Sequence, residues 1–175
     1  MRKHWIGMIG ILCFWTPTLL GQSEPRINWL SWEEAMSRAA TEPRKMLVDV
    51  YTEWCNWCKR MDTTTLDEPD IVRYINTHFY PVRLNAEARR ELTYQGKSYK
   101  YHSRGQKGYH ELAARLLRGR LSYPSIVFLD EQQEVIQSVV GFKTPDQFRA
   151  ITTYFGDDQY KRTPWSTYRR TYSPK

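Results

Sequence analysis

At 175 residues, 41% of them hydrophobic, the chain is long enough to bury the core of one domain without covalent cross-links. Only three cysteines occur, so a disulfide-rich scaffold is excluded. The net charge of +7 would suit an acidic partner or an anionic membrane. Because no basic helix, zinc finger or aromatic RNA-binding motif accompanies this charge, we expect no nucleic-acid partner.

The first 21 residues have the pattern of a signal peptide. Basic residues precede an apolar run over residues 5–20, and a small residue, Gly21, stands where cleavage would follow. The run contains polar residues near its end and falls short of the ~20 apolar residues that cross a bilayer, so a cleaved signal is favoured over an uncleaved membrane anchor. Cys13 would leave with the signal, and the exported protein, periplasmic or secreted, would keep only Cys55 and Cys58.

The domain, expected over residues 27–155, begins with a helix and a buried strand. Ser31 and Glu34, three residues apart, form a capping box that predicts a helix ending near Pro43. Residues 46–54 are mostly apolar and rich in residues that favour strands. Their continuous character predicts a strand buried on both faces.

The two cysteines follow the carboxyl end of this strand. Helical spacing resumes after them, and the pattern predicts a further helix over residues 70–78 and a strand over residues 79–84. Strand, helix and strand make a βαβ unit with the CxxC motif at the strand-to-helix junction.

Residues 86–121 interrupt this pattern. Residues 92–101 alternate around a turn at residues 95–97 and predict a β-hairpin, and residues 109–118 predict an amphipathic helix. For this insertion we favour a packing role over partner recognition.

The rest of the domain is predicted to be a hairpin and a helix. Residues 122–130 (SYPSIVFLD) and 135–142 (VIQSVVGF) form two strands that are close enough in the chain to pair antiparallel, and Thr144 caps a helix that continues to about residue 154. Residues 156–175 are basic and aromatic without apolar periodicity, so we expect a disordered tail or one that lies on the surface.

Cys55 and Cys58, in EWCNWCKR, are compatible with a redox catalyst, a structural disulfide or half of a metal site. At a helix N-terminus, unpaired N–H groups and the helix dipole stabilise a thiolate, which favours Cys55 as a nucleophile. Cys58, one turn later, can resolve a mixed disulfide on Cys55. A bridge this short constrains the unfolded chain little, which disfavours a purely structural role. The remaining histidines, His78, His102 and His110, show no paired ligand spacing, so we expect no metal.

Asp49 lies inside the apolar run, where a carboxylate costs several kcal/mol unless it is paired or protonated. One explanation is an aspartate that accepts backbone hydrogen bonds at a bend. The other is a carboxyl group with a raised pKa that exchanges a proton with Cys58.

Together these residues resemble a known family. LVDVYTEWCNWCK (47–59) resembles the active-site segment of thioredoxins, with Asp six residues before the first Cys, Trp directly before it and Lys after the second. SYPSIVFLD resembles their cis-proline loop and VVGF (139–142) their last strand, and the likeness runs in order over residues 32–154. The sequence of this region is most similar to secreted thioredoxin-like domains, including those of bacterial thiol:disulfide interchange proteins. The resemblance implies a thioredoxin-like three-layer α/β/α fold with a central mixed sheet and an inserted hairpin and helix.

The resemblance also implies roles for individual residues. Cys55 would be the attacking thiol, Cys58 the resolving thiol and Asp49 the buried proton carrier. Pro124 would be the cis proline beside the cysteines, and the backbone of Tyr123 would pair with the substrate as a strand does.

Four further residues of the motif have expected roles or raise a question. Trp54 and Trp57 would offer apolar contact surface to the substrate, and Lys59 is either an electrostatic partner of Asp49 or an ordinary solvated lysine. The dipeptide between the cysteines, Asn56 and Trp57, replaces the Gly-Pro of ordinary thioredoxins. Because this dipeptide strongly affects the redox potential in the family, the direction of electron flow stays open.

The implied function is thiol:disulfide exchange by an extracytoplasmic enzyme that needs no cofactor. We expect a reductase of disulfides in cysteine-containing exported proteins, resupplied with electrons by a membrane partner. Two alternatives remain: a disulfide-forming or isomerising enzyme of the same fold, and a non-enzymatic thioredoxin-like binding module.

Overall fold

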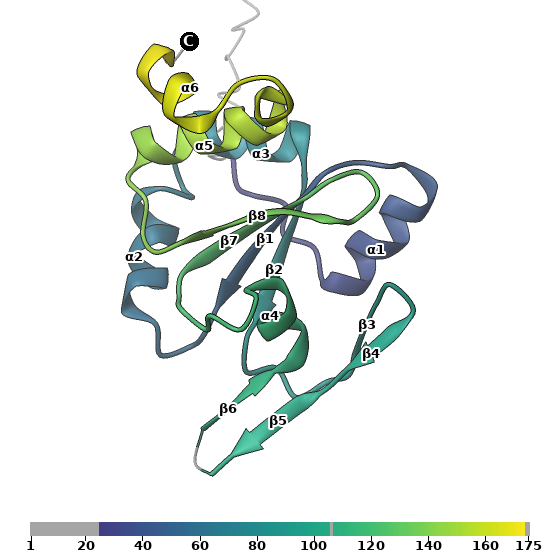
Figure 1. Cartoon of the computed structure of the whole chain (residues 1–175). Helices are drawn as coiled ribbons and strands as arrows, with labels where there is room; N and C mark the ends of the chain where they lie inside the picture. The colour runs from purple at the N-terminus through teal and green to yellow at the C-terminus, as the bar shows by residue number, and fades with distance from the viewer. Residues whose placement is uncertain (1–24, 106, 174–175) are drawn as a thin grey trace, which may run out of the picture.

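A four-stranded sheet lies between two layers of helices, and a two-hairpin extension projects from one end (Figure 1). The computed structural model describes residues 25–105 and 107–173, so the predicted signal peptide, with Cys13, lies outside it. No helix within these residues is both long and apolar enough to cross a membrane. The helices are α1 (Trp32–Thr41), α2 (Asn56–Thr64), α3 (Pro69–His78), α4 (Glu111–Leu116), α5 (Pro145–Gly156), the 3-10 helix η1 (Gln159–Lys161) and α6 (Trp165–Thr171). The strands are β1 (Met46–Tyr51), β2 (Tyr80–Asn85), β3 (Leu92–Tyr94), β4 (Lys97–Tyr99), β5 (Tyr101–Arg104), β6 (Lys107–His110), β7 (Ser125–Leu129) and β8 (Val135–Val140).

The central sheet has the strand order β2-β1-β7-β8. Strand β1 runs parallel to β2 and antiparallel to β7, and β7 pairs antiparallel with β8. The structure therefore confirms the predicted βαβ unit, the closing hairpin and the mixed sheet.

Strand β1 is buried on both faces, as its apolar run predicts. Val48 and Val50 belong to one hydrophobic cluster, which includes Trp32 of α1 and apolar residues of the insertion. Leu47 belongs to a second cluster, formed with residues of α2, α3 and α5. Because side chains alternate along a strand, Asp49 points with Leu47 toward the layer of α2, α3 and α5.

Capping boxes begin two of the helices at the predicted positions. The hydroxyl of Ser31 accepts a hydrogen bond from the Glu34 N–H (3.2 Å), and the Glu34 carboxylate accepts one from the Ser31 N–H (2.8 Å). Thr144 and Gln147 repeat this exchange at the start of α5. Each box satisfies backbone donors that a helix N-terminus otherwise leaves unpaired.

The insertion contains two hairpins where the sequence predicted one. Strands β3 and β4 form the predicted hairpin, and its turn places Gln95 and Gly96 at φ values of 51° and 71°. Strands β5 and β6 form a second hairpin, because Tyr109 and His110 pair with β5 instead of starting a helix.

The helix of the insertion is shorter than the predicted residues 109–118 for a local reason. His110 Nδ1 accepts a hydrogen bond from the backbone N–H of Leu112 (3.1 Å), so His110 caps α4 and does not lie within it. Beyond the helix, Arg118 and Gly119 have positive φ values of 50° and 82°. The chain therefore turns away from the helix axis before it reaches β7.

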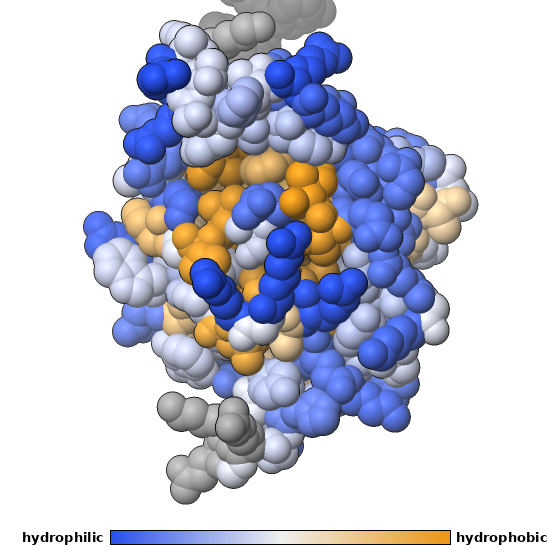
Figure 2. Space-filling model, viewed as in Figure 1, coloured by the Kyte–Doolittle hydropathy of each residue, from blue (hydrophilic) through white to orange (hydrophobic). Residues whose placement is uncertain are grey.

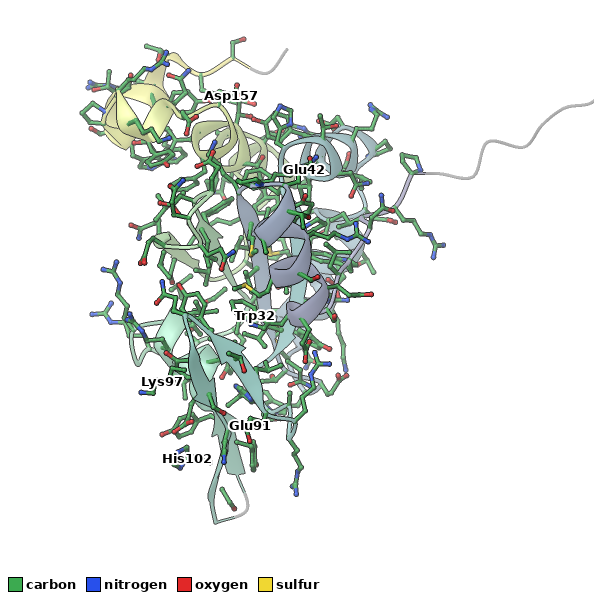
Figure 3. All side chains as sticks on the ribbon, turned by 90° about the vertical axis from the view of Figure 1, so that its right-hand side faces the viewer. Trp32, Glu42, Glu91, Lys97, His102 and Asp157 are labelled. Atoms are coloured by element: carbon green, nitrogen blue, oxygen red, sulfur yellow. A yellow bond between two sulfur atoms is a disulfide. The ribbon has the colours of Figure 1, made fainter. Side chains whose placement is uncertain are left out.

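Contacts with α1 fix the insertion to the domain. The Trp32 indole N–H donates to the Thr93 carbonyl (2.9 Å), and its ring meets that of Tyr94 edge-on at 5.4 Å. In Figure 3 the insertion, marked by Glu91 and His102, lies next to the end of α1 that carries Trp32. The first hairpin is thus part of the packed core, and the second extends from it.

The described part of the C-terminal tail lies on α5. The ring of Tyr154 is 5.1 Å from that of Trp165 and 5.0 Å from that of Tyr168, and its hydroxyl donates to the Thr163 carbonyl (2.7 Å). Helix α6 is held by individual aromatic rings and not by a continuous apolar face. For this reason the sequence shows no helical periodicity over the residues of α6.

Candidate redox site

The two cysteines lie where β1 meets α2. The backbone turns directly after β1, because the Cys55 N–H donates to the Thr52 carbonyl (3.1 Å), and the strand ends at Tyr51 instead of continuing to residue 54 as predicted. Cys55 is then the N-cap of α2, and its Sγ accepts a hydrogen bond from the Cys58 N–H at 3.0 Å.

Cys55 and Cys58 are joined by a disulfide, with their Cα atoms 5.2 Å apart. Only 5% of Cys55 and 3% of Cys58 are exposed. In the reduced protein, the N–H groups at the start of α2 would stabilise a thiolate on Cys55. The pair can therefore carry a reversible two-electron exchange.

A carboxyl group is buried on the same side of the sheet. Asp49 accepts a hydrogen bond from Nε of Arg83 (3.3 Å), the residue directly opposite it on β2. Burial raises the pKa of the Asp49 carboxyl to about 7, while the Arg83 charge lowers this pKa and the Asp62 charge raises it. Within the described residues no backbone group donates to this carboxylate, which disfavours the explanation of an aspartate at a bend.

Arg83 is held between two carboxylates. Its terminal nitrogen donates to both oxygens of Asp62 at 2.8 and 2.7 Å, while its Nε faces Asp49. Asp62 follows Cys58 by four residues on α2, and residues four apart share one face of a helix. Asp49 is thus linked through Arg83 to the face of α2 that carries Cys58. The cation beside Asp49 is Arg83 and not Lys59, which is exposed.

Two loops from distant parts of the chain border the cysteines. The Tyr123–Pro124 peptide bond is cis, and the Pro124 carbonyl accepts a hydrogen bond from the N–H of Gly141, just after β8 (2.8 Å). The ring of Tyr123 meets the ring of Trp54 edge-on at 6.0 Å. Because Trp54 directly precedes Cys55, the loop before β7 lies beside the redox motif.

Exposed aromatic surface flanks the motif. Trp54 is 64% exposed and Trp57 is 54% exposed, which is unusual for side chains of this size. The ring of Trp57 packs on that of Phe142 at 5.5 Å, and the guanidinium of Arg60 stands over the Trp57 ring at 5.2 Å. The Trp54 indole N–H donates to Glu87 (3.1 Å). Two large and mostly exposed aromatic rings therefore lie on either side of Cys55 in the sequence, beside the buried disulfide.

The backbone of Tyr123 is open at this border. Among the hydrogen bonds of the described residues, none involves its N–H or its carbonyl. Strand β7 begins two residues later, at Ser125, so these groups lie beyond the paired part of the sheet. They can pair with an extended chain in the manner of an added strand.

The three histidines among the described residues occupy separate environments. His78 stacks on Tyr74 with ring centroids 3.9 Å apart, His102 faces Glu111 (2.7 Å), and His110 is buried at the start of α4. Across residues 25–105 and 107–173, no three His, Cys, Asp or Glu side chains are grouped so that they could hold a metal ion.

Comparison with known proteins places this site in a family. A family model described as a thioredoxin-like domain matches residues 32–156, which is most of the chain. The chain belongs to this thioredoxin-like family. Family and fold agree with the resemblance carried by the CxxC segment and the proline loop.

Solved structures share the thioredoxin-like fold over most of the chain. A DsbH oxidoreductase has 17% identity and a TM-score of 0.54, covering 79% of this chain and 92% of its own. A thioredoxin-fold protein from Helicobacter pylori has 20% identity and a TM-score of 0.56, covering 73% and 83%. A putative disulphide-isomerase from Bacteroides thetaiotaomicron has 24% identity and a TM-score of 0.52, covering 75% and 95%. At these identities the similarity shows the fold.

Curated relatives match over a shorter segment. Spermatogenesis-associated protein 20 is 27% identical in Mus musculus and 26% identical in Homo sapiens over 78 residues. That segment is 44% of this chain and 10% of the relatives' length. The thioredoxin-like fold and the CxxC pair together support thiol:disulfide exchange as the general chemistry of the site.

Proposed function

We propose that this thioredoxin-like protein is an extracytoplasmic thiol:disulfide oxidoreductase that reduces disulfides in exported proteins. The observation that carries the proposal is the Cys55–Cys58 disulfide at the N-terminus of α2, on the side of the sheet toward which Asp49 is buried. Dithiol exchange requires a stabilised thiolate and a route for the proton of the second thiol.

The first step forms a mixed disulfide. The Cys55 thiolate attacks one sulfur of the substrate disulfide, so a bond forms from Cys55 Sγ to that sulfur and the substrate S–S bond breaks. The other substrate sulfur leaves as a thiolate and takes a proton from solvent. Trp54 and Trp57 provide apolar contact surface for the substrate, and the open backbone of Tyr123 holds its chain in extended form.

The second step releases the substrate. The Cys58 thiol gives its proton to the Asp49 carboxylate, and the resulting thiolate attacks Cys55 Sγ. The Cys55–Cys58 bond forms while the mixed disulfide breaks, and the second substrate sulfur leaves as a thiolate. Two electrons have then moved from the protein dithiol to the substrate. With a pKa of about 7, Asp49 can accept this proton near neutral pH and return it to solvent.

Each turnover leaves the protein oxidised, so a reductase needs a donor. The donor we propose is a membrane protein that presents a reduced dithiol on the outer side and restores Cys55 and Cys58 by the same exchange in reverse. Both electrons stay on sulfur throughout, and the reaction needs no cofactor. The extracytoplasmic location rests on the export pattern of residues 1–21. Fractionation of the expressing cell and the N-terminal sequence of the mature protein test it.

Equilibration with glutathione buffers tests the direction of electron flow. A reduction potential of about −270 mV, as in thioredoxin, supports a reductase. A potential of about −120 mV, as in DsbA, supports a disulfide-forming enzyme. Turnover of a protein disulfide with a dithiol donor tests the activity itself. If the wild-type protein transfers no electrons to any disulfide under these conditions, a non-enzymatic binding module replaces the enzyme.

A further inference from the structure

The positive charge of the chain is concentrated in the insertion. Residues 86–121 contain nine Lys or Arg and three Asp or Glu, a net charge of +6, whereas the whole chain has 26 and 19, a net charge of +7. Outside the insertion, 17 basic residues therefore stand against 16 acidic ones. Charge gathered on one part of a surface produces a field that acts on an approaching partner from that side.

Three exposed arginines end the insertion. Arg115 lies on α4, and Arg118 and Arg120 lie in the segment that follows. None of the three forms an ion pair with another described residue. By contrast, Arg149 on α5 pairs with several carboxylates, Asp146 among them at 2.9 Å. The charge of the three arginines is thus open to a partner.

Both ends of the insertion lie at the redox site. At its start, the carboxylate of Glu87 accepts the hydrogen bond from the Trp54 indole. At its end, Arg120 precedes Tyr123 by three residues, so their Cα atoms are at most ~10 Å apart. Arg120 therefore stands next to the loop with the free backbone groups, and Arg118 and Arg115 lie two and five residues before Arg120 in the chain.

An apolar surface continues from this loop along the edge of the sheet. In the view of Figure 2 it lies between α5 above and α4 below, over β7 and β8, and strongly hydrophilic side chains stand over it at the level of α4. On β8, Val140 is 43% exposed, whereas Ile136 and Val139 are half-buried on the face of the sheet that packs against α5. A chain bound at Tyr123 would meet apolar surface and arginine charge at once.

We infer that the basic insertion selects disulfide substrates in which acidic residues flank the reactive cysteine; this rests on the proposed function of the same site. Opposite charge raises the encounter rate, and a guanidinium fits a carboxylate with two parallel hydrogen bonds. A polypeptide suits the surroundings better than a nucleic acid or a lipid surface does, because the segment that carries the arginines leads directly into the loop beside a thiol-exchange site, exposed tryptophans and unpaired strand-like backbone groups.

The experiment measures kcat/KM for the reduction of three disulfide peptides by the wild-type protein and by two variants. The peptides have equal length, and the residues that flank their cysteines are acidic, neutral or basic. The first variant is Arg115→Gln, Arg118→Gln and Arg120→Gln combined. Glutamine suits the positive φ of Arg118, because Gln95 and Gln133 already have φ values of 51° and 67°. The control variant removes three charges elsewhere, at Arg38 on α1, Arg73 on α3 and Arg170 on α6, all exposed.

The wild-type protein is expected to reduce the acidic peptide with a kcat/KM about tenfold above that for the neutral one at 50 mM salt. This preference should shrink at 500 mM salt, because added ions screen exposed charge. The first variant should lose the preference and keep its kcat/KM for the neutral peptide, and the control variant should behave as the wild type.

Equal kcat/KM for all three peptides would overturn the inference and leave the proposed function standing. Loss of activity on the neutral peptide in the first variant would also overturn it, since the arginines would then support the site itself. Inactivity of the wild-type protein on every peptide would instead remove the proposed function. Saturable binding to duplex DNA or to anionic vesicles, abolished in the first variant and paired with no peptide preference, would assign the insertion to one of those partners.

Discussion

The redox site and the insertion both carry arginines, and their different exposure to solvent gives them different roles. Beneath α2, half-buried Arg83 lies between Asp49 and Asp62 and acts over about 3 Å. In the insertion, Arg115 and Arg120 stand in solvent, where salt at 0.1 M screens charge beyond ~10 Å. Substitutions around Arg83 should therefore alter the chemical steps at every salt concentration. Substitutions of Arg115 and Arg120 should alter only the encounter with charged partners.

The largest effect is expected for Cys55→Ser. A hydroxyl is a far weaker nucleophile than a thiolate at neutral pH, so reduction of every disulfide substrate, charged or neutral, should be abolished. The matched variant Cys58→Ser keeps the attacking thiol and should accumulate a mixed disulfide with the substrate, which mass spectrometry detects. Far-UV circular dichroism should be unchanged in both. A mixed disulfide that forms on Cys58 in the Cys55→Ser variant would reverse the two assignments.

A large effect on stability is expected for Asp49→Asn. Burial raises the pKa of Asp49 from its ordinary value near 4 to about 7, so the folded state binds this proton more tightly than the unfolded state. The resulting stabilisation is complete below about pH 4 and is lost as the pH rises through about 7. Between pH 4 and pH 8, the free energy of unfolding of the variant should therefore rise relative to wild type by up to ~4 kcal/mol.

Urea unfolding of the oxidised proteins at several pH values measures this difference. Asp67→Asn, which removes an exposed carboxylate, is the control. A stability difference between Asp49→Asn and wild type that does not vary with pH would mean that folding does not raise the pKa of Asp49.

The same substitution should slow the second chemical step. Without the carboxylate, Cys58 must lose its proton to water, and general-base assistance of this kind is worth about a hundredfold in rate. Mixing reduced protein with an aromatic disulfide releases the coloured thiol in two phases, the first by attack of Cys55 and the second by attack of Cys58. Only the second phase should slow, and raising the salt concentration should not restore it. Slowing of both phases would indicate that Asp49 acts on Cys55 as well.

The residues of the redox site differ in how far the sequence could reveal them. Cys55, Cys58 and Asp49 lie within one strand-to-helix junction, where spacing along the chain determines their proximity. The role of Arg83 depends on the register of β1 against β2. That register places Arg83 directly opposite Asp49, although the two residues are 34 apart in the sequence. A charged residue in the mostly apolar strand YPVRLN was the available signal, but only the paired sheet shows which carboxylate it meets.

The insertion was harder to predict because its segments fit two periodicities. Tyr109 and His110 continue an amphipathic helical pattern backward from α4, yet they also extend a strand that pairs with β5. The choice between the two depends on contacts of β5, and local propensity does not decide it. The central sheet was easier to predict, since the apolar runs of β1 and β7 are short and rich in residues that favour strands, which is typical of strands buried on both faces.

The smallest effect is expected for Asp62→Asn, which tests whether buried charges act on one another through Arg83. Asp62 holds the guanidinium with two hydrogen bonds, and its charge raises the pKa of Asp49. Loss of that charge should lower the Asp49 pKa, so the second phase of thiol release should persist to lower pH, by less than about one pH unit. Asp146→Asn, which breaks a carboxylate–arginine contact on α5, is the matched control. A shift of the pH profile toward higher pH would show that the main role of Asp62 is to orient Arg83 toward Asp49. Without Asp62, a disordered guanidinium would no longer stabilise the Asp49 carboxylate, and the pKa of Asp49 would rise.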